Sequence, residues 1–326
     1  MRALVTGVNG FVGSYLAEHL VARGWEVRGL VRRTSNLRWI RDLKIELAYG
    51  EVTQPDTLPA AVDGMDVVFH VAGLTKARRS TEYFAVNAQG TAHLLEACVK
   101  NAPGLKRFVL VSSQAAAGPS EGPTPKVESD EPCPVTSYGR SKLLAEQIAL
   151  RYNGQLPVTI VRPSAVYGPR DRDLLVLYRY VARGWKPLLG RRPRLVSVIH
   201  VLDLVRGIVA AAESEGAVGQ TYFLAHRQPV EWEEFADAVA EALGRKARRL
   251  VLPAWVLLPA AAVSEVAAWF AGRPATLNRE KTREIRQRYW VCSVDKARSE
   301  LGFEAEIPLR EGLRETLQWY RREGWL

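Results

Sequence analysis

Apolar segments and helical periodicities alternate along the first half of the chain. Short apolar runs bounded by turn residues predict buried strands at residues 3–6, 26–31, 45–49, 67–71, 107–112 and 158–162. Apolar side chains spaced three or four residues apart predict helices at residues 10–23, 80–101 and 137–152. Near-continuous apolar strands separated by helices are typical of a parallel sheet that is covered on both faces. The pattern therefore predicts an α/β fold with a doubly wound parallel sheet.

The second half of the chain has a different pattern. After a stretch rich in basic and aromatic residues at 170–193, we expect a packed helix at 201–212 and one more strand at 220–224. From residue 230 onward the chain is helical and irregular. We therefore expect a first domain of residues 1–169, completed by about 198–225, and a smaller, mainly helical C-terminal lobe of residues 170–197 and 226–326.

The most apolar stretch of the chain is residues 250–271, whose length approaches that of a membrane span. It contains Pro253, Pro259 and Glu265, and a charged tail follows it. We therefore expect a buried or substrate-facing pair of helices. Peripheral docking on a membrane surface and a true span are the alternatives.

Composition and charge restrict the classes of partner. The chain has 326 residues, of which 47% are hydrophobic, and a net charge of +10. Such a charge either belongs to a solvated surface or attracts anionic ligands such as a phosphorylated cofactor. Because the basic residues are spread along the chain without a nucleic-acid motif, DNA and RNA are not expected as partners.

The chain terminus and the cysteines indicate the compartment. A predicted strand begins almost at Met1, which leaves no room for a signal peptide. Cys98, Cys133 and Cys292 are widely spaced and form no CxxC pair. We therefore expect no disulfide and no metal site, and prefer a cytoplasmic setting.

Glycines follow the first predicted strand with GxxGxxG spacing and open the first helix. Such a turn lets the backbone approach a pyrophosphate, while the helix N-terminus supplies amide donors and a favourable dipole. This context predicts a dinucleotide-binding Rossmann domain. The expected contacts of this turn with the cofactor are Gly7, Asn9, Gly10, Phe11, Val12 and Gly13.

The end of the second strand bears on the choice of cofactor. NAD-preferring sites usually carry an acidic residue there, whereas this chain has Arg32 and Arg33. Guanidinium groups suit a 2′-phosphate, so NADP(H) is favoured and NAD(H) stays open. In the alternative interpretation, one of the two arginines merely stacks on the adenine.

The sequence Ser-Tyr-Gly-Arg-Ser-Lys at 137–142 opens an amphipathic helix. Tyr138 and Lys142 are four residues apart and therefore share one helical face. A nearby ammonium group favours the tyrosinate, so we expect a lowered pKa for Tyr138 and a role as general acid and base. Ser113 ends a predicted strand at the edge where open α/β sheets bind ligands, and is placed to hydrogen-bond the reacting oxygen.

Together these residues resemble the extended short-chain dehydrogenase/reductase family along essentially the whole chain. The resemblance implies that Ser113 polarises the substrate oxygen, Tyr138 transfers a proton and Lys142 also holds the nicotinamide ribose. It also implies a homodimer formed through two helices per subunit, for which residues 80–101 and 137–152 are the candidates. His200 is expected to be structural. Further cofactor contacts are implied at Glu51, Val52, Val71, Ala72, Gly73, Asn87, Ser112, Tyr138, Lys142, Pro163 and Val166.

Two branches of this family fit the chain. Enzymes of nucleotide sugars often carry an asparagine and an arginine where this chain has Ala165 and Val196. These departures and the apolar 250–271 region favour an NADP(H)-linked oxidoreductase of a lipophilic alcohol or ketone. Arginines at 191, 192 and 194 leave the alternative open, a nucleotide-sugar epimerase or dehydratase with tightly bound NAD(P). A cofactor-bound interaction protein is disfavoured because the Ser–Tyr–Lys set is intact.

Overall fold

The computed structural model describes residues 1–271, 275 and 277–326. Its central sheet has seven parallel strands in the order β11-β6-β5-β4-β1-β2-β3. These strands are β1 (Arg2–Thr6), β2 (Glu26–Val31), β3 (Glu46–Tyr49), β4 (Val67–His70), β5 (Arg107–Val111), β6 (Val158–Pro163) and β11 (Thr221–Leu224). From β1 the strand order runs through β2 and β3 to one edge of the sheet and through β4, β5, β6 and β11 to the other edge. This order confirms the predicted doubly wound sheet.

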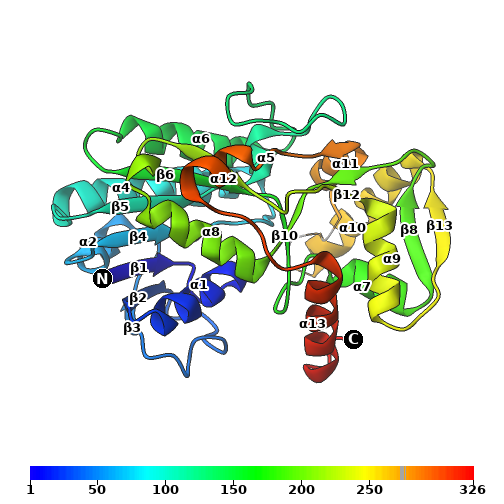
Figure 1. Ribbon diagram of the computed structural model, residues 1–326, viewed down its shortest axis with the longest axis horizontal. Coiled ribbons are helices and arrows are strands. Elements are labelled where there is room, and N and C mark those ends of the chain that lie inside the picture. The colour runs from blue at the N-terminus through cyan, green and yellow to red at the C-terminus, as the bar shows by residue number, and fades with distance from the viewer. Residues whose placement is uncertain (272–274, 276) are drawn as a thin grey trace.

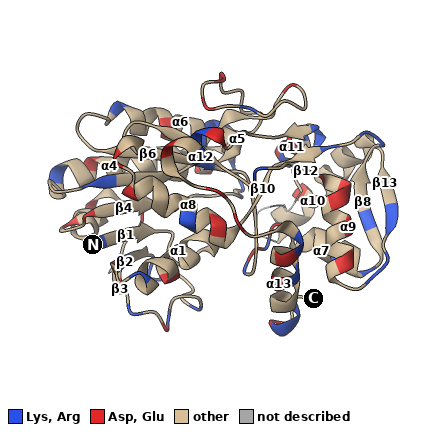
Figure 2. Ribbon diagram, in the orientation of Figure 1, with Lys and Arg blue, Asp and Glu red and all other residues tan. Residues whose placement is uncertain are grey.

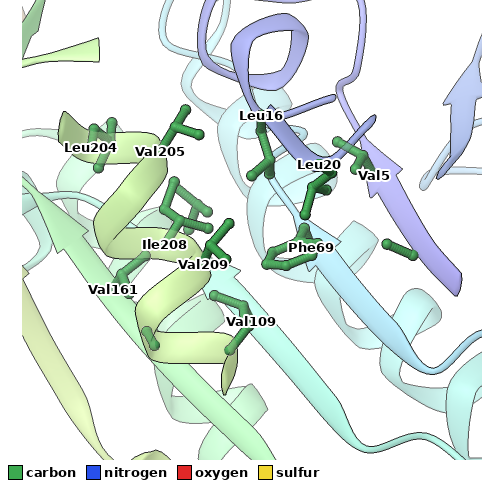
Figure 3. Close-up of a cluster of buried hydrophobic side chains, with 14 of the residues drawn as sticks. Val5, Leu16, Leu20, Phe69, Val109, Val161, Leu204, Val205, Ile208 and Val209 are labelled. Carbon is green, nitrogen blue, oxygen red and sulfur yellow. The ribbon is translucent and has the colours of Figure 1, made fainter. Parts of the chain in front are cut away.

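Helices cover both faces of this sheet (Figure 1). On one face lie α1 (Phe11–Ala22), α8 (Val201–Glu213) and α12 (Asp295–Leu301). On the other lie α2 (Pro59–Val62), α4 (Gly90–Asn101) and α6 (Ser137–Arg151). Figure 3 shows Leu16 and Leu20 of α1 and Ile208 of α8 packing over Phe69 and its neighbouring strands. The sheet is therefore buried on both sides, as its apolar strands require.

The helix predicted at residues 80–101 is interrupted. It consists of α3 (Ser80–Tyr83), a π-helical segment η2 (Phe84–Gln89) and α4. A π-helical turn inserts an extra residue, and such turns occur frequently at functional sites. Here the turn carries Asn87.

A second hydrophobic core lies beside the sheet, to the right in Figure 1. It is built by α7 (Leu175–Ala182), α9 (Trp232–Ala242) and α13 (Leu309–Arg322), with Tyr178 and Phe235 fully buried. Short strands that the sequence did not predict cover this core or join it to the sheet. They are β7 (Ala165–Tyr167), β8 (Trp185–Leu189), β9 (Leu195–Val196), β10 (Val198–His200), β12 (Val230–Glu231), β13 (Arg248–Leu252) and β14 (Tyr289–Trp290).

Residues 250–271 do not form the expected buried or substrate-facing pair of helices. The segment begins in β13, which pairs in parallel with β8, and continues through the short helix η4 (Ala254–Val256) into α10 (Leu257–Phe270). The outer side of α10 faces solvent, and Phe270 is 78% exposed. Among the described residues, no helix is long and apolar enough to cross a membrane.

An aromatic cluster joins the loop after β2 to the C-terminal helix α13. The ring of Trp39 lies 5.5 Å from that of Trp319, which lies 4.9 Å from that of Trp325. The guanidinium groups of Arg38 and Arg170 lie 3.6 and 4.9 Å from the Trp39 ring. Tilted and edge-to-face ring contacts, together with cation–π contacts, therefore connect the two hydrophobic cores.

Candidate active site

Two of the predicted catalytic residues lie in the first turns of α6. This helix begins after Thr136, whose hydroxyl oxygen accepts a hydrogen bond from the Gly139 N–H at 3.1 Å and so caps the first turn. Tyr138 is the second helical residue and is half-buried. Lys142 lies one turn further along the same face and is 4% exposed.

The third predicted catalytic residue, Ser113, lies between β5 and the short helix α5 (Gln114–Ala117). Its Oγ accepts a hydrogen bond from the Ala115 N–H at 3.1 Å, and its side chain is close enough to Tyr138 to lower the pKa of the phenol. A Cβ atom on Gly139 would lie 2.4 Å from the Ala115 carbonyl oxygen. Glycine beside Tyr138 therefore allows α5 to pack closely enough on α6 for Ser113 to reach the phenol.

The pKa of Tyr138 differs from the value expected from the sequence. Burial raises the pKa of Tyr138 to about 12, and the nearby Ser113 side chain only partly opposes this rise. Burial lowers the pKa of Lys142 to about 8, and its Nζ donates a hydrogen bond to the Val111 carbonyl oxygen at 2.6 Å. The expected lowering of the phenol pKa is therefore wrong, because desolvation of the phenolate prevails. At neutral pH Tyr138 is a neutral phenol, the form that donates a proton.

A buried ion pair lies next to Lys142. Glu146, four residues after Lys142 on α6, pairs with Arg162 of β6 at 2.7 Å, and both side chains are at most 6% exposed. Ser112 Oγ also hydrogen-bonds to Glu146. The carboxylate of Glu146 favours the charged form of Lys142 and so opposes the effect of burial on its pKa. The sequence analysis assigned no role to Glu146, although the four-residue spacing indicates a shared face.

Asn87 connects the cofactor side of the sheet to α6. Its Nδ2 donates hydrogen bonds to Ser141 Oγ at 2.9 Å and to the Leu74 carbonyl oxygen at 3.1 Å, while its Oδ1 accepts from the Leu74 N–H at 2.7 Å. A Cβ atom on Gly73 would lie 3.1 Å from Oδ1. Asn87 therefore holds the segment after β4 against the helix that carries Tyr138 and Lys142.

A buried histidine supports the same segment. His70 Nδ1 lies 2.8 Å from Thr6 Oγ1, and its Nε2 lies 3.0 Å from Thr91 Oγ1. Thr6 Oγ1 also accepts a hydrogen bond from the Ala72 N–H at 3.1 Å. Burial lowers the pKa of His70 to about 3, so this hydrogen-bonded bridge carries no charge at neutral pH.

The glycine-rich turn has the shape that a backbone-bound pyrophosphate requires. A Cβ atom on Gly7, whose φ is +69°, would lie 2.9 Å from Ala72 Cα, and one on Gly13 would lie 2.1 Å from the Gly7 carbonyl oxygen. All residues of α1 are among those that the structure describes. The helix begins after Gly10, and its first turn has neither a side-chain cap nor an acidic residue. Its first amide groups are therefore available to an anion. These residues fit a bound NAD(P).

The two arginines after β2 have different surroundings. The Arg33 guanidinium lies 5.2 Å from the Tyr49 ring centroid, whereas the exposed Arg32 side chain has no hydrogen-bond or ion-pair partner among the described residues. The same loop reaches the glycine-rich turn, since Asn9 Nδ2 donates to the Asn36 carbonyl oxygen at 3.4 Å. Arg32 is therefore the freer of the two to bind a phosphate.

The other predicted cofactor contacts lie at or just beyond the carboxyl ends of the strands. They are Glu51, Val52, Val71, Ala72, Gly73, Ser112, Pro163 and Val166. Val52 packs against α4, because a Cβ atom on Gly90 would lie 2.6 Å from its Cγ2. His200 packs edge-on against Tyr167, and burial lowers its pKa to about 4.

The arginines proposed to compensate for Ala165 and Val196 have different surroundings. Arg194 donates hydrogen bonds to three backbone carbonyl groups and is thereby committed to the fold. Arg191 and Arg192 line a hollow of about 390 Å³ that also contains Glu231 and Glu233. Arg194 and Arg249 also line this hollow, and Arg249 is paired with Glu233.

A second carboxylate near the site, besides Glu146, was not predicted from the sequence. Glu280 of α11 (Arg279–Arg286) accepts hydrogen bonds from the Ser137 N–H at 3.1 Å and from the Ser137 hydroxyl at 2.6 Å. It also lies 3.5 Å from Arg140. A carboxylate from the C-terminal part of the chain thus caps the helix that carries Tyr138.

The sheet topology, the glycine-rich turn and the Ser–Tyr–Lys set at the carboxyl ends of the strands define an NAD(P)-dependent oxidoreductase of the extended short-chain dehydrogenase/reductase type. The chain belongs to the NAD dependent epimerase/dehydratase family, whose model matches residues 3–225.

Relatives and solved structures match the chain over almost its full length. It is 32% identical to a ceramide reductase of Caulobacter vibrioides, over 99% of this chain and 95% of the relative. It is 33% identical to a 3β-hydroxysteroid dehydrogenase/Δ5→4-isomerase of Mycobacterium tuberculosis, over 98% and 90%. The crystal structure of gox2253 is similar with a TM-score of 0.83 and 30% identity, over 100% and 99%. The structure of MoeE5 with UDP-glucuronic acid and NAD is similar with a TM-score of 0.78 and 27% identity, over 99% and 100%.

Proposed function

We propose that the chain interconverts a lipophilic ketone and its secondary alcohol, with Ser113, Tyr138 and Lys142 as catalytic residues. The observation that carries this proposal is the neutral phenol of Tyr138, which lies beside Ser113 and one helical turn before Lys142. When bound, NAD(P) supplies or accepts the hydride. The protein's own residues then have to transfer one proton to or from the substrate oxygen and stabilise the charge that develops on that oxygen.

Each of the three residues has a distinct role. Ser113 Oγ already accepts from the Ala115 N–H, which leaves its hydroxyl proton to hydrogen-bond the substrate oxygen. In reduction, Tyr138 donates its proton to that oxygen while the carbonyl carbon gains hydride, and the phenolate regains a proton from solvent. The Lys142 ammonium group, held by the Val111 carbonyl, stabilises this phenolate. Asn87 and Glu146 position the helix and the lysine rather than react.

The lipophilic substrate class is supported by the relatives and by the site. The two curated relatives are named for a ceramide and for hydroxysteroids. Ala165 and Val196 offer no polar group to a diphosphate, and Arg194 is bound to backbone carbonyl groups. Burying a diphosphate without paired donors is costly, whereas burying hydrocarbon is favourable by about 25 cal/mol per Å².

Thermal-shift screening with each cofactor present tests the substrate class. Steroid ketones and ketones of long-chain lipids should raise the melting temperature, and UDP and UDP-sugars should not. The ligands that stabilise should also oxidise NADPH in the wild type but not in Tyr138→Phe. If UDP-sugars stabilise the protein and no lipophilic ketone does, the nucleotide-sugar alternative replaces this proposal.

For the cofactor we propose NADP(H), with the 2′-phosphate on Arg32 and the pyrophosphate on the glycine-rich turn and the first amides of α1. Residues 1–169, completed by 198–225, form the cofactor domain, and α12 packs on its sheet. Residues 170–197 and the rest of 226–326 form the substrate lobe. This division is supported by the second hydrophobic core.

We also propose a cytoplasmic homodimer that pairs through α4 and α6. These helices contact each other, and each carries exposed apolar side chains, Val99 on α4 and Leu144 and Leu150 on α6. The three cysteines are free, as a reducing compartment requires.

A further inference from the structure

The outer side of α10 is an apolar surface without charge. Its large side chains Leu258, Val263, Val266, Trp269 and Phe270 are between 49% and 78% exposed. Helices on protein surfaces normally present polar and charged residues to water. An uninterrupted apolar patch of this kind marks an interaction site.

The inner side of the same helix accounts for its attachment to the protein. Leu257, Ala261 and Ala268 are buried, at the helical spacing of one face. The one charged residue of α10, Glu265, accepts a hydrogen bond from the Arg279 N–H at 2.8 Å and lies 3.5 Å from the Arg279 guanidinium. The charge on α10 therefore belongs to its contact with α11, and the outer face remains apolar.

The chain around α10 is strongly basic. Residues 245–286 contain nine Lys and Arg and three Asp and Glu, a net charge of +6 of the chain's +10. The three acidic residues are engaged: Glu265 with Arg279, Glu280 with Ser137, and Glu284 with Lys281. Figure 2 shows Lys and Arg on both α11 and β13, the elements that follow and precede α10. The surface therefore combines apolar side chains with an excess of positive charge.

We propose that α10 docks the protein on an anionic membrane surface, lying in the plane of the interface. At 1.5 Å per residue its 14 residues span about 21 Å, which is too short to cross a bilayer. Trp255, just before α10, and Trp269 and Phe270, at its end, place aromatic rings at both ends of the apolar face, where they partition into the headgroup region. A second copy of the chain is a poorer occupant, because it brings another segment of charge +6 against the first.

Docking at α10 has a direct route to the active site. Ser264 accepts a hydrogen bond from the Leu277 N–H at 3.4 Å, and Glu265 from the Arg279 N–H, so α10 holds the start of α11. The next residue, Glu280, caps the helix of Tyr138. The outer face of α10 is thus connected through α11 to the catalytic helix α6. If the proposed function holds, the bilayer is the reservoir of the lipophilic substrate.

Co-sedimentation of the full chain with vesicles tests docking without any turnover assay. The protein should pellet with phosphatidylcholine vesicles containing ~30% phosphatidylglycerol, and less with pure phosphatidylcholine or at ~0.5 M salt, which screens the charges. Val263→Asp and Trp269→Ser should each weaken vesicle binding at least tenfold. Val218→Asp, at an apolar residue 40% exposed outside this surface, should bind like the wild type.

Circular dichroism and NADPH binding verify that each variant is folded. Wild-type protein that stays in the supernatant with anionic vesicles overturns the proposal. So does unchanged vesicle binding by Val263→Asp and Trp269→Ser together with a changed elution volume in gel filtration, which assigns the face to a second copy. Neither result bears on ketone turnover in detergent, so the proposed function is judged separately.

Discussion

Glu280 and Ser137 lie 143 residues apart in the sequence, yet the carboxylate of Glu280 accepts hydrogen bonds from both the backbone N–H and the hydroxyl of Ser137. The residue next to Ser137 is Tyr138. The first turn of the catalytic helix is therefore held by the same part of the chain that we propose to bind substrate. The position of the proton donor therefore depends on the position of α11.

Replacing Glu280 with alanine should lower both stability and turnover. Loss of a buried cap removes charge-assisted hydrogen bonds and should cost about 1–2 kcal/mol in urea unfolding. The kcat should fall severalfold because Tyr138 is less well held, while cofactor affinity stays the same. Glu96→Ala, at an exposed helix position paired with Lys100, is the control and should change neither quantity. Wild-type kcat in Glu280→Ala would show that the cap is structural only.

Removing the phenol should abolish catalysis and leave cofactor binding intact. Tyr138→Phe should lose about a hundredfold or more in kcat, the usual contribution of a general acid. Tyr83→Phe is the matched control, since the Tyr83 ring lies 6.0 Å from that of Tyr138 outside the proposed proton path. Retention of wild-type kcat by Tyr138→Phe would disprove the assignment.

The pH dependence of reduction should follow Lys142 rather than Tyr138. With a pKa of about 12, Tyr138 keeps its proton throughout the neutral range, so it sets no limit there. With a pKa of about 8, Lys142 is charged at lower pH and loses its charge as the pH rises through that value. The kcat/KM for reduction should therefore be constant near neutrality and fall in alkaline solution. A fall in kcat/KM that begins well below pH 7 would contradict the assignment of this pH dependence to Lys142.

Arg32 should determine the preference for NADPH. Arg32→Ala should weaken NADPH binding about tenfold or more, because a hydrogen bond to a charged group contributes about 1.5–3 kcal/mol. Affinity for NADH should not change. Arg41→Ala, at an exposed arginine paired with Asp42, controls for the loss of one positive charge. Isothermal titration measures both cofactors, and equal wild-type affinities for NADPH and NADH would refute the preference.

A methyl group on Gly139 should separate the catalytic residues without touching the cofactor turn. Its Cβ would lie 2.4 Å from the Ala115 carbonyl oxygen, so α5 has to move away from α6. We expect Gly139→Ala to cost about 1–3 kcal/mol of stability and at least tenfold in kcat, with cofactor affinity retained. Gly104→Ala is the control, because no atom lies within 4 Å of its Cβ.

The strands and helices that could be predicted from the sequence are those with a recognisable pattern among neighbouring residues. The bounds of β2 are those expected, and the other sheet strands differ by a residue or so at an end. Ser113, Tyr138 and Lys142 were found because each lies at the end of a strand or the start of a helix with a recognisable pattern. These signals depend on neighbours within about four residues, which a sequence displays directly.

What could not be predicted depends on distant partners. The strand β13 forms because β8, more than 60 residues earlier, offers it a parallel edge. Glu280 has no sequence signal that connects it to Ser137. The pKa of Tyr138 was predicted in the wrong direction because the spacing places Lys142 on the same helical face but does not show the burial of the phenol, which raises its pKa.

The aromatic cluster of Trp39, Trp319 and Trp325 gives the molecule an optical reporter. The Trp319 ring lies 5.5 Å from that of Trp39 and 4.9 Å from that of Trp325, and in the loop after β2 Trp39 lies just after Asn36, whose carbonyl oxygen accepts a hydrogen bond from Asn9. Cofactor that orders this loop alters the surroundings of Trp39, and therefore its fluorescence emission. The difference between the wild type and Trp39→Phe isolates this signal from the remaining tryptophans. Occupancy of the nucleotide site can thus be followed in stopped-flow mixing without a dye or a label.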